Sequence, residues 1–125
     1  MQTRTRPKHL NLFQISLPIP GIMSIMHRAS GFVLFLALPL FIWWLQLSLT
    51  SPESYAQFKG ILSNPLCKLI ALALMWGYFH HLCAGTRHLF LDLGMGLDLP
   101  AARLTAKLAI AGGIILTVLV GVCIW

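Results

Sequence analysis

Three long runs of apolar residues, separated by segments that hold most of the charged side chains, dominate the pattern along the chain. The first run covers residues 31–49, the second 69–86 with an extension toward Leu91, and the third 108–125. Each approaches the roughly 20 residues that a helix needs to cross about 30 Å of hydrocarbon. None alternates apolar and polar residues with a period of two, so the pattern predicts helices rather than barrel strands.

The predicted fold is therefore an all-α integral membrane protein with three transmembrane helices. Pro39 lies inside the first run, where a membrane helix tolerates it with a kink. The first run is too long and begins too late to be a cleaved signal peptide. We expect a single membrane-anchor domain over residues 1–125, with a leader at 1–23 and spans at about 29–50, 66–91 and 104–125.

The leader mixes basic residues, prolines and short apolar blocks, and it predicts a segment at the membrane surface or against a partner subunit. Pro18 and Pro20 are expected to prevent a helix up to that point. From Gly21 to Arg28 the sequence allows a helix that runs directly into the first span.

Composition agrees with a membrane protein and restricts what the chain does alone. Of 125 residues, 58% are hydrophobic and only 10% are charged, against about 25% charged in soluble domains. Three isolated cysteines cannot hold an iron–sulfur cluster without other ligands, and no glycine-rich phosphate motif supports a flavin, NAD or ATP site. The cysteines inside spans are expected to be small apolar residues.

The positive charge reports topology rather than a nucleic-acid partner. Nine Lys and Arg against three Asp and Glu give a net charge of +6. Because cytoplasmic segments carry the excess of cations, we expect the N-terminus and the second connection in the cytoplasm and the C-terminus outside. Trp43, Trp44 and Trp125 are then expected near the outer interface. The cations assigned to the cytoplasmic side are Arg4, Arg6, Lys8, Arg28, Arg87, Arg103 and Lys107.

A stripe of histidines and glycines follows one face of the second span. An ionisable residue inside a span is a functional-site hypothesis by default. Gly77 and Gly85, one turn on either side of His81, predict clearance beside its imidazole, which a haem ligand needs. The alternative is a small-residue stripe that packs helices, with the histidine bonded between them. His80 points elsewhere and is expected to be structural. Residues on this face are Leu74, Gly77, His81, Gly85, His88 and Asp92.

The entry to the first span carries a second polar group. Ser24 and Arg28 lie one turn apart on one helix face, with His27 offset by one position. A hydroxyl and a fixed cation at interfacial depth suit a quinone carbonyl, whose oxygen becomes negative on reduction. His27 or Arg28 could instead pair with a haem propionate. The alternative is an arginine that only anchors the helix at the interface.

Taken together, these motifs resemble the cytochrome b membrane-anchor subunit of succinate dehydrogenase. The similarity covers nearly the whole chain and includes the three-span plan. The matching residues are Arg6-Pro7, Ser24-x-x-His27-Arg28-x-Ser30-Gly31 and His81-x-x-x-Gly85-x-Arg87-His88-x-x-x-Asp92-x-Gly94.

The resemblance implies a haem b- and ubiquinone-binding subunit of the bacterial inner membrane. His81 would be an axial haem ligand, with the other axial histidine from a second membrane-anchor subunit that completes the bundle. Ser24 and Arg28 would bind ubiquinone, and His27, Arg28 and His88 would lie near the haem propionates. The implied partners are that second anchor, a flavoprotein subunit, an iron–sulfur subunit and membrane lipid.

The implied activity is electron transfer from succinate oxidation to quinone, with no independent catalysis by this chain. Two alternatives stay open at this point. One is a fumarate reductase-type anchor that runs the reaction in reverse. The other is a structural or transport three-helix subunit without haem, whose histidines pack helices or relay protons.

Overall fold

The computed structural model describes residues 16–124, and every regular element in that range is a helix. In chain order these are α1 (Ile19–Thr50), α2 (Pro52–Ser63), α3 (Pro65–Asp92) and α4 (Leu99–Ile124). Among the described residues, α1, α3 and α4 are long and apolar enough to cross a membrane. The all-α class with three spans is confirmed. The predictions for leader residues 1–15 and for Trp125 fall outside the described residues.

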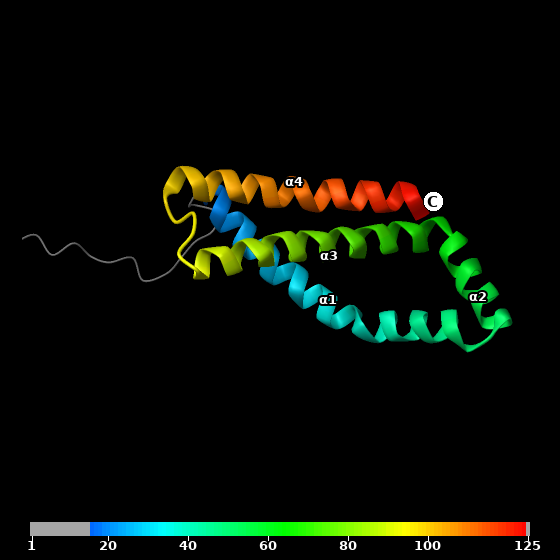
Figure 1. Cartoon of the computed structure of the whole chain (residues 1–125). Coiled ribbons are helices and arrows are strands. Elements are labelled where there is room, and N and C mark those ends of the chain that lie inside the picture. Colours follow the sequence, from blue (N-terminus) through cyan, green and yellow to red (C-terminus); the bar gives the residue numbers. More distant parts are fainter. Residues whose placement is uncertain (1–15, 125) are drawn as a thin grey trace, which may run out of the picture.

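The first helix begins earlier than the predicted span. Pro18 has extended backbone angles and stands as its N-cap, while Pro20 is accommodated in the first turn. A backbone amide in the first turn has no hydrogen-bond partner within the helix, so a proline there removes no helical hydrogen bond. The last residues of the predicted leader, 19–23, are therefore helical. Farther along, α1 changes direction near Pro39 (Figure 1), as a proline inside a helix requires.

The connection between the first two spans contains the short helix α2, which the apolar pattern did not predict. Ser51 and Ser54 form a reciprocal capping box at its start, and Ser54 Oγ also donates to Leu47 O of α1 at 2.8 Å. Hydrogen bonds from the Ser51 hydroxyl and the backbone amide hold the pKa of Glu53 below its usual value. The carboxylate thus stays ionised beside the positive end of α2.

Helix α3 follows α2 after a single residue and ends in a tight turn. Asn64 caps its start, its side chain accepting from the amide of Leu66 at 2.9 Å. At the other end, the amide of Met95 donates to Phe90 O and that of Gly94 to Leu91 O. This is a Schellman motif, and Gly94 has the positive φ of 78° that the motif demands.

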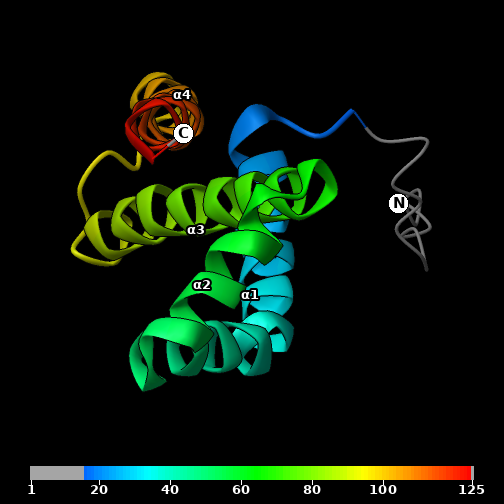
Figure 2. The same cartoon turned by 90° about the vertical axis from the view of Figure 1, so that its right-hand side faces the viewer.

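Helix α4 packs against α3 through small residues. Figure 2 views α4 end-on, with α3 crossing it at an angle. A Cβ at Gly113 would lie 2.9 Å from His80 Cα and 3.1 Å from its N. The two backbones approach this closely only because Gly113 has no side chain. The buried apolar cluster of the described chain adds one side chain of α1 to this interface and comprises Met23, Ala84, Ala106 and Ala109.

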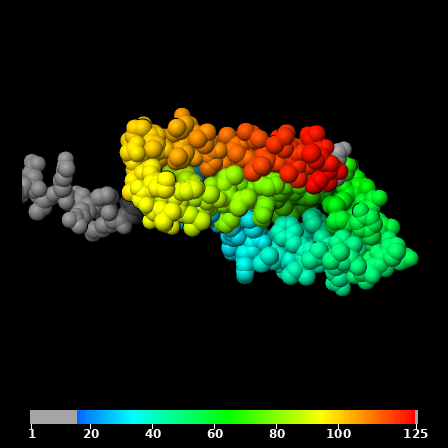
Figure 3. Space-filling model, in the orientation of Figure 1, coloured from blue at the N-terminus to red at the C-terminus, as the bar shows by residue number. Residues whose placement is uncertain are grey.

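Most apolar side chains outside this interface face outward. The long surface in Figure 3 has α4 and α3 along one side and α1 and α2 along the other. On α1, Phe32, Phe35 and Leu36 are each at least 60% exposed. In water such a surface would be strongly unfavourable, so lipid or another membrane subunit must cover it. Completion of the bundle by a second anchor subunit remains a prediction.

The start of α1, the end of α3 and the start of α4 lie at one end of the molecule (Figure 1). Arg28, Arg87, Arg103 and Lys107 lie in the parts of these helices nearest that end. This arrangement agrees with the predicted cytoplasmic side, which stays a prediction. At the opposite end, Trp43 is exposed as expected of an interfacial belt. Trp44 instead turns inward, and its buried Nε1 has no described partner.

Replacing Gly113 by alanine is expected to separate α3 from α4. The new Cβ would meet backbone atoms of His80, which cannot yield as a flexible side chain can. We expect the free energy of unfolding to fall by about 1–3 kcal/mol, measured by thermal melting of the full-length protein in detergent.

The matched control is Gly60→Ala in α2, where a Cβ meets nothing within 4 Å. Alanine favours the helix there, so this variant should melt at the same temperature or higher. Equal melting of the two variants would contradict the proposed role of the close approach.

Candidate functional site

The site is built where α1 crosses α3, by two histidines that each lie against a glycine of the other helix. A Cβ at Gly31 of α1 would lie 2.8 Å from His81 Cε1. A Cβ at Gly85 of α3 would lie 3.2 Å from His27 Nε2. A side chain at Gly31 would overlap the His81 ring, and one at Gly85 would make the His27 ring move slightly, so the two glycines set how closely the imidazoles approach the opposite helix.

The hydrogen bonds of His81 determine which ring nitrogen is available. Its Nδ1 lies 3.0 Å from His27 O and 3.2 Å from Ser30 Oγ, while Ser30 Oγ itself donates to His27 O. Since the carbonyl can only accept, Nδ1 carries the proton and donates. Nε2 then holds the free lone pair, and no described residue bonds it. A metal-binding histidine typically has this arrangement.

His27, His81 and His88 form one group, which we call the histidine cluster. The rings of His27 and His81 stack with centroids 4.1 Å apart and planes 13° from parallel. His88 is tilted against His27 at 5.0 Å. Ring nitrogens bind metals in the plane of the ring, so stacked His27 and His81 cannot ligate one iron from opposite sides. This geometry excludes His27 and His81 as the two opposite ligands of a single metal ion.

The predicted clearance beside His81 is correct at one glycine and wrong at the other. Around Gly77 no atom lies within 4 Å of a Cβ position, so space is open there. At Gly85 the imidazole of His27 occupies the space instead. The sequence pattern placed both glycines on the His81 face, but it did not reveal that α1 would bring His27 against that face.

Ser24 and Arg28 lie one turn apart on α1, as the spacing predicted. Ser24 is partly buried and Arg28 is exposed. Within residues 16–124 neither side chain has a hydrogen bond or an ion pair that would occupy its polar atoms. The guanidinium is therefore accessible. Arg28 directly follows His27 in α1, but within residues 16–124 neither Ser24 nor Arg28 has a side-chain hydrogen bond to the histidine cluster. Asp92, the last residue of α3, is also exposed.

Arg87 has a structural role that the motif alone did not reveal. It is only 8% exposed, its Nε donates to Thr105 Oγ1 at 3.0 Å, and its Nη2 donates to Ala102 O at 3.1 Å. These bonds connect α3 to α4, on a side of α3 away from the histidine cluster. Arg87 and His88 are neighbours in sequence, but they point to different helices.

His80 is buried in the α3–α4 interface with 1% of its surface exposed. Its ring stacks with Trp76 at 5.5 Å, and its backbone lies against Gly113. Neither ring nitrogen has a hydrogen-bond partner among the described residues. It belongs to the helix interface rather than to the histidine cluster, and it remains without an assigned function.

Sequence reasoning did not assign roles to Ser30 and Gly31, although both stood in the motif. Ser30 contacts the His81 ring, and Gly31 makes room for it. The sequence does show that Ser30 and Gly31 lie one turn after His27, on the same face of α1. It does not show where α1 crosses α3, so it could not indicate that this face meets His81.

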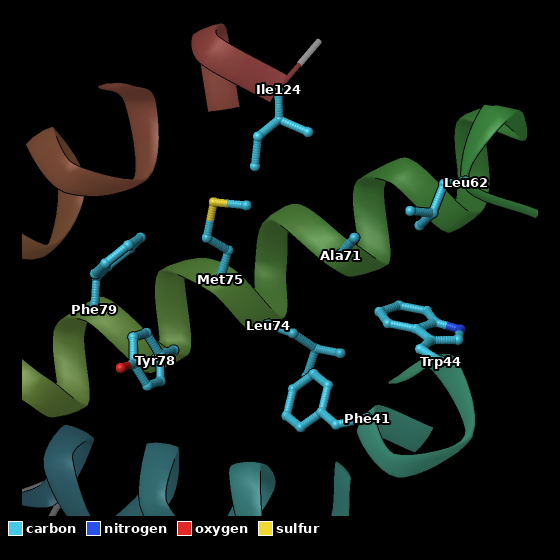
Figure 4. A pocket seen from close by; sticks show the side chains of 9 residues that line it. All are labelled: Phe41, Trp44, Leu62, Ala71, Leu74, Met75, Tyr78, Phe79 and Ile124. Carbon is cyan, nitrogen blue, oxygen red and sulfur yellow. The ribbon is translucent and has the colours of Figure 1, made fainter. Parts of the chain in front are cut away.

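An apolar cavity of about 350 Å³ lies toward the opposite end, among all four helices. Figure 4 shows Leu74 of α3 pointing toward Phe41 of α1, while Met75 on the other side of α3 points toward Ile124 of α4. No group of polar side chains lines this cavity that would orient a small polar ligand. Among the described residues, no three His, Cys, Asp or Glu side chains are placed to hold a metal ion.

Comparison with known proteins matches the chain to a family. The model of the succinate dehydrogenase/fumarate reductase transmembrane subunit matches residues 2–120. The chain is 38% identical over 111 residues to the succinate dehydrogenase cytochrome b556 subunit of Paracoccus denitrificans, covering 89% of this chain and 84% of the relative. It is 40% identical over 121 residues to the cytochrome b556 subunit of Coxiella burnetii, covering 96% and 97%.

A more distant relative is the succinate dehydrogenase cytochrome b560 subunit of Reclinomonas americana, 32% identical over 116 residues, or 89% of this chain and 79% of the relative. These matches span nearly the whole chain, including the three candidate membrane helices and both segments of the histidine cluster. The chain therefore belongs to the family of transmembrane subunits of succinate dehydrogenase and fumarate reductase.

Proposed function

We propose that this chain is the membrane anchor of a succinate dehydrogenase that binds haem b and ubiquinone. In this role it docks the catalytic subunits and passes electrons from succinate oxidation to quinone. The observation that carries the proposal is the hydrogen-bonded state of His81. Its Nδ1 donates to His27 O at 3.0 Å, which leaves Nε2 free as a ligand inside a membrane helix.

The residues around His81 fit a haem. The backbone carbonyl fixes the tautomer and orientation of the imidazole, Gly31 accommodates its edge, and the space at Gly77 is open. Bound there, haem b would supply a one-electron carrier. Because stacked His27 cannot be the second ligand, we assign that ligand to a histidine of a second membrane-anchor subunit. This chain then forms half of a shared binding site.

The polar residues toward the charged end of α1 and α3 would hold the haem propionates. His27 and His88 extend the histidine cluster in that direction, and Arg28 adds an exposed guanidinium beside His27 in sequence. A guanidinium can bind a carboxylate through two parallel hydrogen bonds. These three residues are proposed to bind or surround the propionates, and none of them would contact the iron.

Ser24 and Arg28 are the proposed ubiquinone-binding residues. The Ser24 hydroxyl and the Arg28 guanidinium can both donate to one quinone carbonyl oxygen from a single helix face. When the quinone accepts two electrons, that oxygen gains negative charge, and the fixed cation stabilises it. Two protons complete the reduction, and the charged end of the molecule, where Arg28 lies, is the side from which they would arrive.

The proposed complex contains a flavoprotein subunit and an iron–sulfur subunit in addition to the second anchor. This chain has neither a nucleotide motif nor a set of cluster ligands, so those cofactors must belong to partners. The bacterial relatives support a place in the cytoplasmic membrane. A fumarate reductase-type anchor is the second candidate, because the matched family includes both enzymes. The redox potentials of the partners would decide the direction.

His81→Ala in the purified membrane complex is expected to abolish most of the b-type haem absorption, since the variant removes the only iron ligand assigned to this chain. The measurement is the reduced-minus-oxidised optical spectrum, with copurification of the other subunits as the assembly readout. The exposed neighbour Leu89→Ala should leave the spectrum unchanged. An unaltered spectrum in His81→Ala would refute the axial assignment and favour histidines that only pack helices.

Gly31→Ala tests how His81 is positioned. The added Cβ would lie 2.8 Å from His81 Cε1, so the imidazole must shift away from its hydrogen-bonded position. We expect haem affinity to fall by about tenfold, as it does when residues that orient a metal ligand are changed. Haem content and midpoint potential are the readouts. Gly21→Ala on the same helix, with no contact closer than 3.7 Å, should change neither.

Arg28→Ala is expected to slow quinone reduction by about a hundredfold, because it removes the cation beside the developing oxygen charge. Succinate oxidation by a soluble artificial acceptor should continue at its normal rate. The control is Arg103→Ala, an exposed cation at the same end of the molecule. Loss of both activities in Arg28→Ala would indicate failed assembly, and retention of both would exclude Arg28 from the quinone site.

A further inference from the structure

A groove of about 770 Å³ lies between the end of α3 and the start of α4. Its location is near the turn that joins these helices in Figure 1. The walls are mainly apolar, but three polar side chains gather within it. Lining residues include Leu82, Phe90 and Leu108 among the apolar ones and Thr86, Arg87 and Thr105 among the polar ones.

Arg87 is a nearly buried cation without an acidic partner. Its bonds to Thr105 Oγ1 and Ala102 O use Nε and Nη2, and both acceptors are uncharged. The chain has only three acidic residues, and among the described residues none forms an ion pair with Arg87. A buried charge is costly unless an opposite charge compensates it. An anion from outside this chain would therefore be needed to compensate the charge of Arg87.

This groove is separate from the proposed haem and quinone sites. His81 bonds to α1, whereas Arg87 bonds to α4, so the two side chains leave α3 on different sides. Ser24 and Arg28 belong to α1 and do not line the groove. An anion beside Arg87 would thus be a different ligand from the haem propionates.

The depth and the walls of the groove identify the class of anion. Arg87 lies five residues before the end of α3, or about 7.5 Å along the helix. We expect the charged ends of α3 and α4 at the membrane surface, so Arg87 is expected close to the lipid headgroups. Phe90 and Leu108, at least half exposed, offer apolar walls beside the cation. Arg103 and Lys107 add exposed positive charge on α4, which attracts anionic lipid to this leaflet.

We propose that the α3–α4 groove is a binding site for an anionic phospholipid. The phosphate pairs with Arg87 and accepts a hydrogen bond from its Nη1, while an acyl chain lies along Leu82, Phe90 and Leu108. A free phosphate satisfies only the first part of this site, because it leaves the apolar walls uncovered. The lipid thereby compensates the charge that holds α3 to α4.

The test uses the whole membrane complex, purified in detergent and reconstituted into bilayers. One set contains phosphatidylcholine alone, and the other contains phosphatidylcholine and phosphatidylglycerol in equal amounts. The measurements are the melting temperature and the ratio of the two lipids retained after delipidation. For the unmodified complex we expect a higher melting temperature with phosphatidylglycerol and its selective retention. Arg87→Gln should lower the retained ratio about fivefold, as expected for one interfacial cation.

Controls separate this site from general surface charge and from misfolding. Arg103→Gln removes an exposed cation near the same end and should keep most of the selectivity. Leu108→Trp fills the groove while leaving Arg87 and its bonds to α4 unchanged, so it should lose lipid selectivity in a complex that still assembles. This second variant decides the question if Arg87→Gln does not fold.

Two results would overturn the proposal. One is equal retention of phosphatidylglycerol by the unmodified complex and by Leu108→Trp, which would mean that the groove does not hold the lipid. The other is equal stabilisation of the unmodified complex in detergent by inorganic phosphate, which would make the groove an anion site without a lipid requirement. Neither result depends on haem binding, so failure here is distinguishable from failure of the proposed electron-transfer function.

Discussion

The close crossing of α1 and α3, with an imidazole of each helix against a glycine of the other, is the constraint on which the arrangement of the site depends. Gly31 admits the edge of His81, and Gly85 admits His27. At this separation His81 reaches the backbone carbonyl of His27. One contact geometry thus sets the distance between helices, the tautomer of His81 and the direction in which its free nitrogen can act. A side chain at either glycine would disturb all three.

The third helix is polar on two sides for different reasons. Toward α1 it presents the histidine cluster, where the proposed cofactor chemistry takes place. Toward α4 it presents His80 and Arg87, in an interface that also contains glycines, alanines and Cys83. Because small residues bring the backbones of α3 and α4 together, the long arginine side chain can reach an α4 carbonyl and hydroxyl. The two buried polar side chains of the described residues, His80 and Arg87, therefore both lie where α3 meets α4.

Much of the fold could be predicted from the sequence because lipid imposes strict rules on length and polarity. Three apolar runs predicted three spans; α3 begins and ends within one residue of the expected 66–91, whereas α4 begins five residues before the expected 104. The sequence allowed a helix from Gly21, and α1 begins two residues earlier, since prolines in a first helical turn do not interrupt a helix. Helix α2 was missed because its signal is local: Ser51 before Pro52 and Glu53 favours a helix start without any long apolar pattern.

The sequence by itself determined the helical class, the membrane spans, the uneven distribution of charge and the face of α3 that carries His81. These properties follow from hydropathy and from the 3.6-residue period, which need no knowledge of neighbouring helices. Only the tertiary structure decided that His27 stacks on His81, that Ser30 and Gly31 belong to the site, and that Arg87 turns to α4. Such contacts depend on where two helices cross and how closely they approach. That geometry results from packing of residues far apart in the chain, and a single helical pattern does not contain it.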